Sequence, residues 1–504
     1  MIEAGYARVR WAATAILIAC LAFFAVTTLH WPLVGDSSLM HYVAFLMHHG
    51  MRPYHDIAEI NFPGAFLVDD AVIHMLGGGS VAWRIFDWML MGAGLGAMSA
   101  IALPEDWFAG VFAGALLALI HGRDGVFDAG QRDLVIAVLL LIGYAALLRA
   151  TRKASPPWLL LFGLCAGAAG TIKPTYVIWG PAVLLLLLLL CRRKGISRAA
   201  ALGCAGGGFL LPLAAVGLWL WRMQALSDFV HESRTLMLYH AGLAHRPLGY
   251  LLLHSVAPVL PLVFVWGVAI LFHEERWLSW ERAALAVGLA VGLLSFLVQG
   301  KGYPYQRYPL IAVLLLVMGM DLVRAARQRG WGRVAGWIGL AYGVLLLAPV
   351  SAHAASEYQW WNLEFQDALV ADLNRLGGEQ LSGEVQCIDT VGGCYGALYA
   401  ARLVESSGFL YDEFLFGAER NGVVADSRKE FWNDLQARPP RVIIVVDGVF
   451  PPGASGFGKL ALWPEFNDLL EHDYSLYDEK TPPNMVYWWS RPDPPHRYRI
   501  YLRR

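Results

Sequence analysis

Long apolar runs fill the chain from about residue 11 to residue 350, and one of them, Pro181–Leu190, is almost unbroken leucine. A helix that crosses a bilayer needs about 20 apolar residues, and it satisfies its own backbone hydrogen bonds there. The pattern predicts an α-helical polytopic membrane domain. About eleven spans are expected, at about 11–31, 82–102, 107–120, 133–150, 157–172, 174–191, 199–221, 250–272, 283–299, 304–323 and 333–350.

The pattern changes near residue 352, where the chain becomes charged and rich in turns. We therefore predict two domains: a membrane domain over residues 1–351, with an outer loop at 32–81, and a soluble α/β domain over 352–504. Short β-branched runs predict strands in the second domain. The strands are expected at 385–388, 441–447 and 498–501, and the helices at 357–376, 395–407 and 427–437.

Composition supports this division. Of 504 residues, 57% are hydrophobic and 16% are charged, whereas a soluble protein carries about 25% charge. The net charge of −1 argues against a nucleic-acid partner. Arg8 and Arg10 precede the first apolar run, as in a signal peptide, but no small-residue cleavage site follows, so we expect a retained first helix.

Cations predict the topology, because loops on the cytoplasmic side carry an excess of Lys and Arg. Most loops assigned to the inner side contain clustered cations when the N-terminus is cytoplasmic. If residues 62–79 also crossed the membrane, every later loop that carries clustered cations would lie on the outer side. The segment also contains Asp69, Asp70 and His74, so we do not count it as a span. We place this segment on the outer face as an interfacial or re-entrant element. The soluble domain then lies outside, which in a bacterium is the periplasm next to the inner membrane.

The outer loops hold most of the unusual polar residues of the membrane half. Asp36 follows the first helix, where a carboxylate can accept a proton from an incoming hydroxyl or amine, or can simply be solvated. Asp133 begins a predicted helix, so it is either a helix cap or a second carboxylate that faces Asp36. Lys173, Lys301 and Arg307 could hold a phosphate, whereas cations and aromatics at this depth are also ordinary interfacial anchors.

Two other groups of residues bear on metal or disulfide chemistry. His41, His48, His49 and His55 do not have the spacing of a zinc site, so a structural role is favoured. Cys387 and Cys394 could form a small-loop disulfide on the oxidising side. No metal site is predicted, and a divalent cation stays open.

Three motifs of the first outer loop together resemble the GT-C glycosyltransferases that use polyprenyl-phosphate sugars. They are an acid after helix one (Asp36), a Gly–x–x–Pro–Tyr–x–Asp stretch (residues 50–56) and Asn–Phe–Pro–Gly (residues 61–64). The group includes the lipid A aminoarabinose transferase and the protein O-mannosyltransferases. Later parts of the chain look like further landmarks of the bacterial members of this family. They are the helix start at Gln131–Asp133, the turn at Lys173–Pro174 and the turn at residues 300–308. The resemblance covers about residues 10–350.

The resemblance implies transfer of a sugar from an outer-leaflet polyprenyl phosphate to an acceptor, with inversion. Asp36 would be the general base, and Asp133 matches the acid of the second loop. Lys173, Lys301 and Arg307 would hold the leaving phosphate. Further substrate contacts are expected from Arg52, Tyr54, Asp56, Asn61, Arg132 and Tyr305.

The sequence also departs from the family pattern. Ser37 follows Asp36 where some members have Asp–Glu, and Asn61 stands where some have lysine. The expected partners are the lipid-linked donor, membrane lipids and an acceptor such as a lipopolysaccharide, another glycan or a protein. A transporter or flippase of lipid-linked sugars would share the cations and aromatics, and a surface-polysaccharide ligase would differ in its donor, so both remain alternatives.

Overall fold

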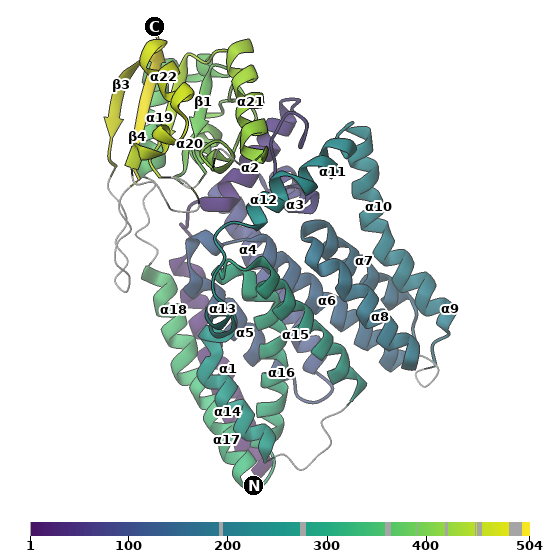
Figure 1. The fold of residues 1–504 in the computed structure, drawn as a ribbon. Coiled ribbons are helices and arrows are strands. Elements are labelled where there is room, and N and C mark those ends of the chain that lie inside the picture. Colours follow the sequence, from purple (N-terminus) through teal and green to yellow (C-terminus); the bar gives the residue numbers. More distant parts are fainter. Residues whose placement is uncertain are drawn as a thin grey trace.

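The computed structural model describes residues 2–190, 195–272, 279–357, 364–390, 392–418, 422–448, 450, 456–482 and 496–504. Helices form an elongated bundle, and a smaller domain with a sheet lies at the end opposite the N-terminus (Figure 1). The predicted fold class is confirmed: a helical membrane domain is followed by a small mixed α/β unit.

All eleven predicted apolar segments are helical. Among the residues that the structure describes, eight helices are long and apolar enough to cross a membrane, and Pro157–Ile172 and Pro174–Leu189 are shorter apolar helices. The helices of these segments are α1 (Ile2–Thr27), α4 (Ser80–Ala102), α5 (Trp107–Asp124), α6 (Arg132–Lys153), α7 (Pro157–Ile172), α8 (Trp179–Leu190), α9 (Arg198–Ala201), α10 (Gly207–Arg222), α13 (Leu248–Val256), α14 (Leu260–Leu271), α15 (Trp280–Gln299), α16 (Tyr308–Ala326), α17 (Trp331–Tyr342) and α18 (Ala348–Ser356).

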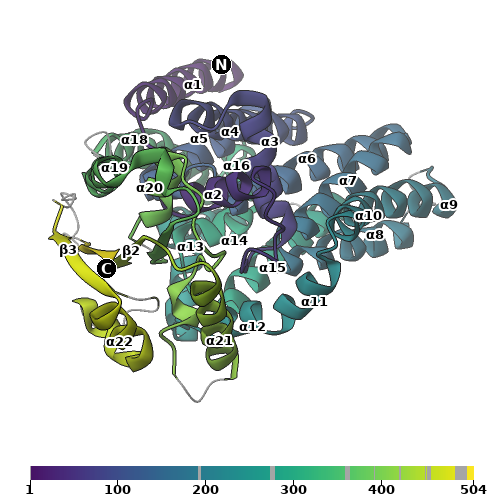
Figure 2. The same cartoon turned by 90° about the horizontal axis from the view of Figure 1, so that it is seen from above.

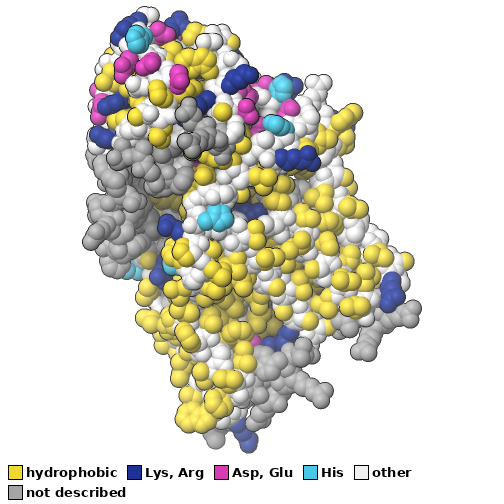
Figure 3. All heavy atoms as spheres, in the orientation of Figure 1, with side chains coloured by type: hydrophobic (Ala, Val, Ile, Leu, Met, Phe, Trp, Pro, Cys, Tyr) yellow, Lys and Arg dark blue, Asp and Glu magenta, His cyan; other side chains and the backbone are white. Residues whose placement is uncertain are grey.

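Burial separates the central helices from the peripheral ones. In the most apolar stretch of Pro304–Ala326, which contains α16, 94% of residues are buried, against 17% for Tyr6–Thr27 in α1. The α1 surface is therefore left for lipid, while α16 packs against α5, α6, α15 and α17. Apolar side chains cover the visible flank of the bundle, and charged ones gather on the smaller domain (Figure 3).

The outer loop folds into two helices, α2 (Gly35–His48) and α3 (Pro63–Leu76). Pro63 occupies the first turn of α3, where a missing N–H costs nothing. The 14 residues of α3 give a length of about 21 Å, which is short of the roughly 30 Å hydrocarbon core. The helix does not count among the candidate spans, and it packs on α2, α4 and α7.

The C-terminal domain contains a four-stranded mixed sheet of order β1-β2-β4-β3. Its strands are β1 (Val385–Ile388), β2 (Val442–Val446), β3 (Tyr474–Lys480) and β4 (Tyr498–Arg503). β1 and β2 run parallel with Val385 opposite Val442, and β4 is antiparallel to both β2 and β3. The five residues of β2 are all buried, which explains why their apolar run was recognisable.

The helices of this domain are α19 (Glu364–Leu376), α20 (Cys394–Ala401), α21 (Gly422–Ala437) and α22 (Pro464–His472). The predicted helix 395–407 is too long, because Arg402 adopts a left-handed backbone with φ of 57° and ends α20. The predicted helix 357–376 falls partly on 358–363, outside the described residues. The sequence prediction missed β3, an exposed strand, and α22. Cys387 and Cys394 form a disulfide.

The smaller domain covers only part of the bundle. Seen from above, α7, α8 and α10 extend beyond it on one side (Figure 2). It rests instead on the outer loop, since α20 packs against α2. Tyr42 of α2 donates to the carbonyl oxygen of Leu403 at 3.1 Å and accepts from the backbone N–H of Glu405 at 3.0 Å. The outer loop is thus a layer between the two parts.

Candidate functional site

Asp36 lies in the first turn of α2, next to the start of α6. The preceding Gly35 has φ of 60°, and a Cβ there would lie 2.9 Å from the Phe127 ring, so the close turn requires glycine. Ser37 donates to the carbonyl oxygen of Ala129 at 3.2 Å. These contacts fix α2 to the second outer loop. The Asp36 side chain remains 43% exposed, so a substrate can reach its carboxylate.

Arg132, the first residue of α6, bridges the two outer loops. One guanidinium nitrogen lies 3.3 Å from Asp36 Oδ2, and the other donates to Asn61 Oδ1. Tyr305 points its hydroxyl at the same carboxylate oxygen of Asp36, at 3.4 Å. Four residues predicted for the site therefore meet at one point, although they come from positions as distant as 36 and 305.

Lys173 and Asp133 form a second contact beside Arg132. The Lys173 ammonium lies 2.7 Å from both carboxylate oxygens of Asp133 and 2.8 Å from Gln299 Oε1. The Asp133 carboxylate is fully buried, and its hydrogen bonds in the described structure go to Lys173. Its role is thus to pair with Lys173, rather than to cap α6. The charges of Asp36 and Asp133 both act on Arg132, which joins the two contacts electrostatically.

Lys301 reaches the same region from the turn after α15. Its ammonium contacts His240 Nε2, and His240 Nδ1 contacts the Glu413 carboxylate of the C-terminal domain. The ammonium also lies 5.1 Å from the centre of the Phe450 ring. Burial lowers the pKa of Lys301 to about 8, although the Glu413 charge opposes the shift; the charges of Arg132, Asp36 and Lys173 act on it as well.

We call this group the polar cluster. It consists of Asp36, Asn61, Arg132, Asp133, Lys173, Lys301 and Tyr305. Every member comes from an end of a helix or from a loop on the same side of the bundle as the C-terminal domain. The cluster combines one accessible carboxylate with three cations, which is an arrangement suited to an acidic phosphate and a proton-donating partner.

The other predicted site residues make contacts of their own outside the polar cluster or at its edge. Arg307 donates to Asp124 at 2.6 Å and to the His254 carbonyl oxygen at 3.3 Å. Tyr54 donates to the Asn61 carbonyl oxygen at 2.5 Å, which supports the Asn61 backbone. Arg52 pairs with Asp56, whose pKa is lowered because hydrogen bonds from Arg52 outweigh burial. A substrate role for these residues stays a prediction.

The region around Arg52 and Asp56 borders a separate cavity of about 460 Å³. Tyr54, His55 and Asp56 line it from the outer loop, Glu232 from α11 (Leu226–Arg234), and Glu430 from α21. The cavity thus lies between the membrane half and the C-terminal domain. Asp56, the partner of Arg52, lines this cavity, whereas Tyr54 also reaches toward Asn61.

Sequence reasoning missed the residues that hold the polar cluster in place. Glu59 is fully buried, and its carboxylate accepts from the Asn61 side chain at 2.6 Å and from Tyr411 at 3.0 Å. Burial raises the pKa of Glu59. Gln299, Glu413 and His240 were also missed. The one signal in the sequence is that Glu59 lies two residues before Asn61. Tyr411 and Glu413 are far from the outer loop in the sequence, so no local pattern connects them to it.

The described residues contain one group of three potential metal ligands, His48, Asp70 and His74, and it lies outside the polar cluster. The use of a divalent cation, for which the sequence names no ligands, stays a prediction. Asp389, directly after β1, accepts from the backbone N–H groups of Gly392 and Cys394 and so shapes a turn.

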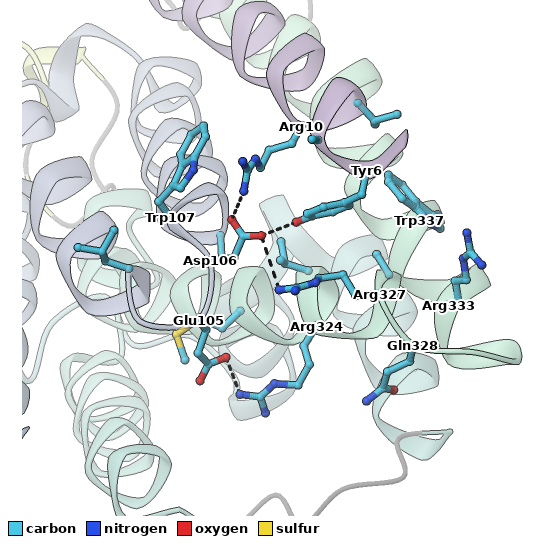
Figure 4. A pocket seen from close by; sticks show the side chains of 17 residues that line it. Tyr6, Arg10, Glu105, Asp106, Trp107, Arg324, Arg327, Gln328, Arg333 and Trp337 are labelled. Atoms are coloured by element: carbon cyan, nitrogen blue, oxygen red, sulfur yellow. Dashed lines mark hydrogen bonds and ion pairs between the residues drawn. The ribbon is translucent and has the colours of Figure 1, made fainter. Parts of the chain in front are cut away.

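The opposite end of the bundle has a polar cavity of about 940 Å³ between α1, α5, α16 and α17 (Figure 4). Asp106 accepts from Tyr6 at 2.8 Å and from Arg10 at 3.2 Å, and Arg324 pairs with Glu105 at 2.5 Å. These arginines belong to loops predicted to be cytoplasmic. Arg324 and Tyr305 lie at opposite ends of the same helical segment, so the cavity is distant from the polar cluster.

No protein-family model matches the sequence, and no curated protein matches it. Solved structures do match. ArnT from Cupriavidus metallidurans bound to undecaprenyl phosphate has 13% identity and a TM-score of 0.56, with 96% of this chain and 97% of that chain covered. Its apo state gives 12% identity and 0.57, with 99% and 98% covered.

A second enzyme is also similar. The Archaeoglobus fulgidus oligosaccharyltransferase AglB, in complex with an inhibitory peptide and a dolichol-phosphate, has 12% identity and a TM-score of 0.52. That match covers 86% of this chain and 69% of that chain. The ArnT match extends over nearly the full length of both chains, so it includes the C-terminal domain as well as the bundle. The chain therefore has the fold of the GT-C superfamily.

Proposed function

We propose that the protein is a membrane glycosyltransferase that moves a sugar from a polyprenyl-phosphate donor in the outer leaflet to a periplasmic acceptor. The observation that carries the proposal is the polar cluster, which places the accessible Asp36 carboxylate beside Arg132, with Lys173 and Lys301 close enough to interact electrostatically. A sugar phosphate needs such a set, because its phosphate binds cations while the attacking group must lose a proton.

In the proposed reaction, an acceptor oxygen or nitrogen attacks the anomeric carbon of the donor. The bond from that carbon to the phosphate oxygen breaks, and the configuration inverts. Asp36 takes the proton of the acceptor and later releases it to water. The polyprenyl phosphate leaves with one more negative charge than the donor had, and preorganised cations stabilise that charge as it develops.

Arg132, Lys173 and Lys301 are the proposed phosphate ligands. Arg132 stands between Asp36 and Asn61, so its planar guanidinium can hold both the base and the phosphate in register. The Lys173 ammonium lies within hydrogen-bond distance of both Asp133 oxygens and of Gln299, so a bound phosphate would share its three N–H bonds with these partners. These cations replace the lysine that some family members have where this chain has Asn61.

Two features of the fold support the proposed orientation. The polar cluster and the C-terminal domain lie at one end of the bundle, and the arginine-lined cavity lies at the other. With the arginine-rich end on the cytoplasmic side of a bacterial inner membrane, the polar cluster faces the periplasm. Donors in the outer leaflet and acceptors such as lipopolysaccharide, another glycan or a protein would then meet there.

The direct test is Asp36→Asn, assayed for sugar transfer in membranes supplied with polyprenyl-phosphate sugars. Transfer should fall by about 100-fold or more, since general-base catalysis contributes roughly 10²–10⁴-fold. Asp468→Asn, on the exposed face of α22, is the matched control and should retain full transfer. Undiminished transfer by Asp36→Asn at normal expression would refute the role of Asp36.

A second assay separates the transferase from the alternatives. Reconstituted vesicles would be tested for covalent transfer and for translocation of the donor lipid. Covalent transfer from a monophosphate donor supports the proposal. Translocation without transfer would identify a flippase, and use of a diphosphate donor alone would identify a ligase.

A further inference from the structure

A histidine-rich group lies on the outer loop, outside the polar cluster. His48 stands at the end of α2, and Asp70 and His74 lie one turn apart on α3. The potential ligand atoms of the three side chains are all within 4.8 Å of one another. Asp70 is partly buried, while both histidines are exposed, so an ion in solution can reach them.

The two histidines converge on one carboxylate oxygen. Asp70 Oδ1 lies 2.6 Å from His48 Nε2 and 3.4 Å from His74 Nδ1, and the two ring centres are 4.8 Å apart. His74 Nδ1 also lies 2.9 Å from the backbone carbonyl oxygen of Asp70, a hydrogen bond that this nitrogen must give up to bind a metal. An ordinary helix-to-helix ion pair needs only one histidine. Here the second imidazole comes from the helix of Asp70 itself, so the three groups form a triangle rather than a pair.

The chemistry of the triangle favours a borderline transition metal. Two imidazoles and one carboxylate form a three-ligand set that Zn²⁺ accepts, with water at the fourth position. Zinc–ligand bonds are about 2.0–2.2 Å long, so tetrahedral ligand atoms lie about 3.3–3.5 Å apart. The separation of 3.4 Å matches that spacing, the 2.6 Å contact must lengthen, and all the ligand atoms lie within 4.8 Å of one another, so side-chain rotations can bring them to it. Ca²⁺ and Mg²⁺ prefer oxygen ligands.

We propose that His48, Asp70 and His74 form a zinc site that fastens the end of α2 to α3. The two helices are already joined at two other levels. Arg132 connects Asp36, at the start of α2, with Asn61, just before α3. His41 Nδ1 lies 2.8 Å from Asp69 Oδ1 at mid-height. A metal at His48 adds a third connection at the far end, away from the polar cluster.

The spacing of the early histidines does not predict this site. His41, His48, His49 and His55 are near one another in the sequence, but only His48 belongs to the triangle. His41 pairs with Asp69, His49 bonds to the carbonyl oxygen of Phe45, and His55 lies 2.7 Å from Asp228. The pairing of α2 with α3 brings the other two ligands from the segment 62–79.

The test uses the full chain, purified in detergent with an affinity tag free of histidine. After dialysis against micromolar Zn²⁺, bound zinc is measured by mass spectrometry, and Tm is followed with and without Zn²⁺. Metal that binds only the folded state raises Tm. The wild type should hold one more zinc equivalent than the variant His48→Ala/His74→Ala, whose Tm should not respond to Zn²⁺.

Two further variants make the result specific. His49→Ala removes an adjacent histidine outside the triangle and should keep the zinc equivalent and the Tm response. Asp70→Asn keeps the side-chain shape and should weaken zinc binding at least 10-fold. Equal zinc content in the wild type and the double variant would overturn the proposal. So would an adventitious ion only, seen as binding restricted to millimolar Zn²⁺.

Discussion

At the scale of residues, each cation of the polar cluster already has a partner within the protein. Arg132 has Asp36 and Asn61, Lys173 has Asp133, and Lys301 has His240. A bound phosphate would therefore share these cations with their present partners. Among the carboxylates of the polar cluster, Asp36 is the one that combines a cationic neighbour with substantial exposure. A general base that takes a proton from an incoming hydroxyl or amine needs both properties.

Lys301 gives the cluster a predictable pH dependence. Its pKa is lowered to about 8 by burial, so the ammonium is charged at pH 7 and loses its proton as the pH rises through about 8. If the charged form holds the phosphate, kcat/KM for the donor should fall about tenfold per pH unit above that value. Lys301→Arg should abolish this fall, because a guanidinium stays charged.

The pH profile is measured from pH 6 to pH 10 with the donor below KM. Lys429→Arg, an exposed lysine of α21, should reproduce the wild-type profile. A profile that is flat above pH 8 in the wild type, or equally steep in Lys301→Arg, would rule out Lys301 as the titrating phosphate ligand.

The sequence predicts part of this site for a physical reason. Asp36, Asn61, Arg132, Lys173 and Lys301 stand next to turns in an otherwise apolar chain, where polar residues are rare and conspicuous. Glu59, His240, Tyr411 and Glu413 could not be found in that way. They lie in segments rich in polar residues, and their importance comes from contacts across up to 352 positions.

At the scale of elements, the close approach of α3 to the end of α7 positions the outer loop. A Cβ at Gly64 would lie 2.5 Å from Thr171 Oγ1 and 2.7 Å from the Ile172 nitrogen. The contact places the start of α3 two residues from Lys173. Glycine at position 64 is thus a condition for bringing Asn61 and Lys173 into one cluster.

Gly64→Ala should force α3 away from α7. Overpacking of this kind costs about 1–3 kcal/mol, so we expect a lower Tm and a higher KM for the donor. Gly92→Ala is the control, since a Cβ there meets nothing within 4 Å in the middle of α4. Calorimetry and transfer kinetics compare the two variants, and equal behaviour would refute the tight α3–α7 contact.

Elements differ in how well the sequence predicts them. The length of the apolar runs and the turn residues between them predict the helices of the bundle. This works because each helix faces lipid or other helices, so its residues are apolar along its length. The strand β3 was missed since its residues are largely exposed, with the charged stretch Asp478–Lys480. Its place in the sheet depends on pairing with β4, which no local pattern encodes.

At the scale of the whole molecule, carboxylates face one another across the cavity between the two parts. Burial raises the pKa of Glu232 on α11 to about 7, and the charge of Glu430 on α21 adds to the shift. The folded state thus keeps this proton up to about pH 7, whereas an unfolded glutamate, with a pKa near 4.5, has released it. The contribution of the protonated Glu232 to the free energy of unfolding is complete below pH 4.5 and is lost as the pH rises toward 7.

Glu232→Gln should therefore raise Tm at pH 8.5 and leave it unchanged near pH 4.5. The side chain is partly exposed, so solvent screening reduces the gain to about 1 kcal/mol, or about 1–2 °C. Thermal unfolding of both proteins at the two pH values measures it. Glu465→Gln, exposed on α22, should show no such difference, and an equal shift at both pH values would contradict the prediction.

The contacts between Tyr42 and residues 403–405, and between Glu59 and Tyr411, also bear on how the chain is made. The outer loop is synthesised early, and its partners at residues 403–411 are synthesised late. The buried polar groups of the loop therefore form these hydrogen bonds only after most of the chain has been made. A nascent or truncated chain would present Glu59 and the apolar face of α2 unpaired, as a substrate for chaperones and proteases. Completion of the site is in this sense coupled to completion of synthesis.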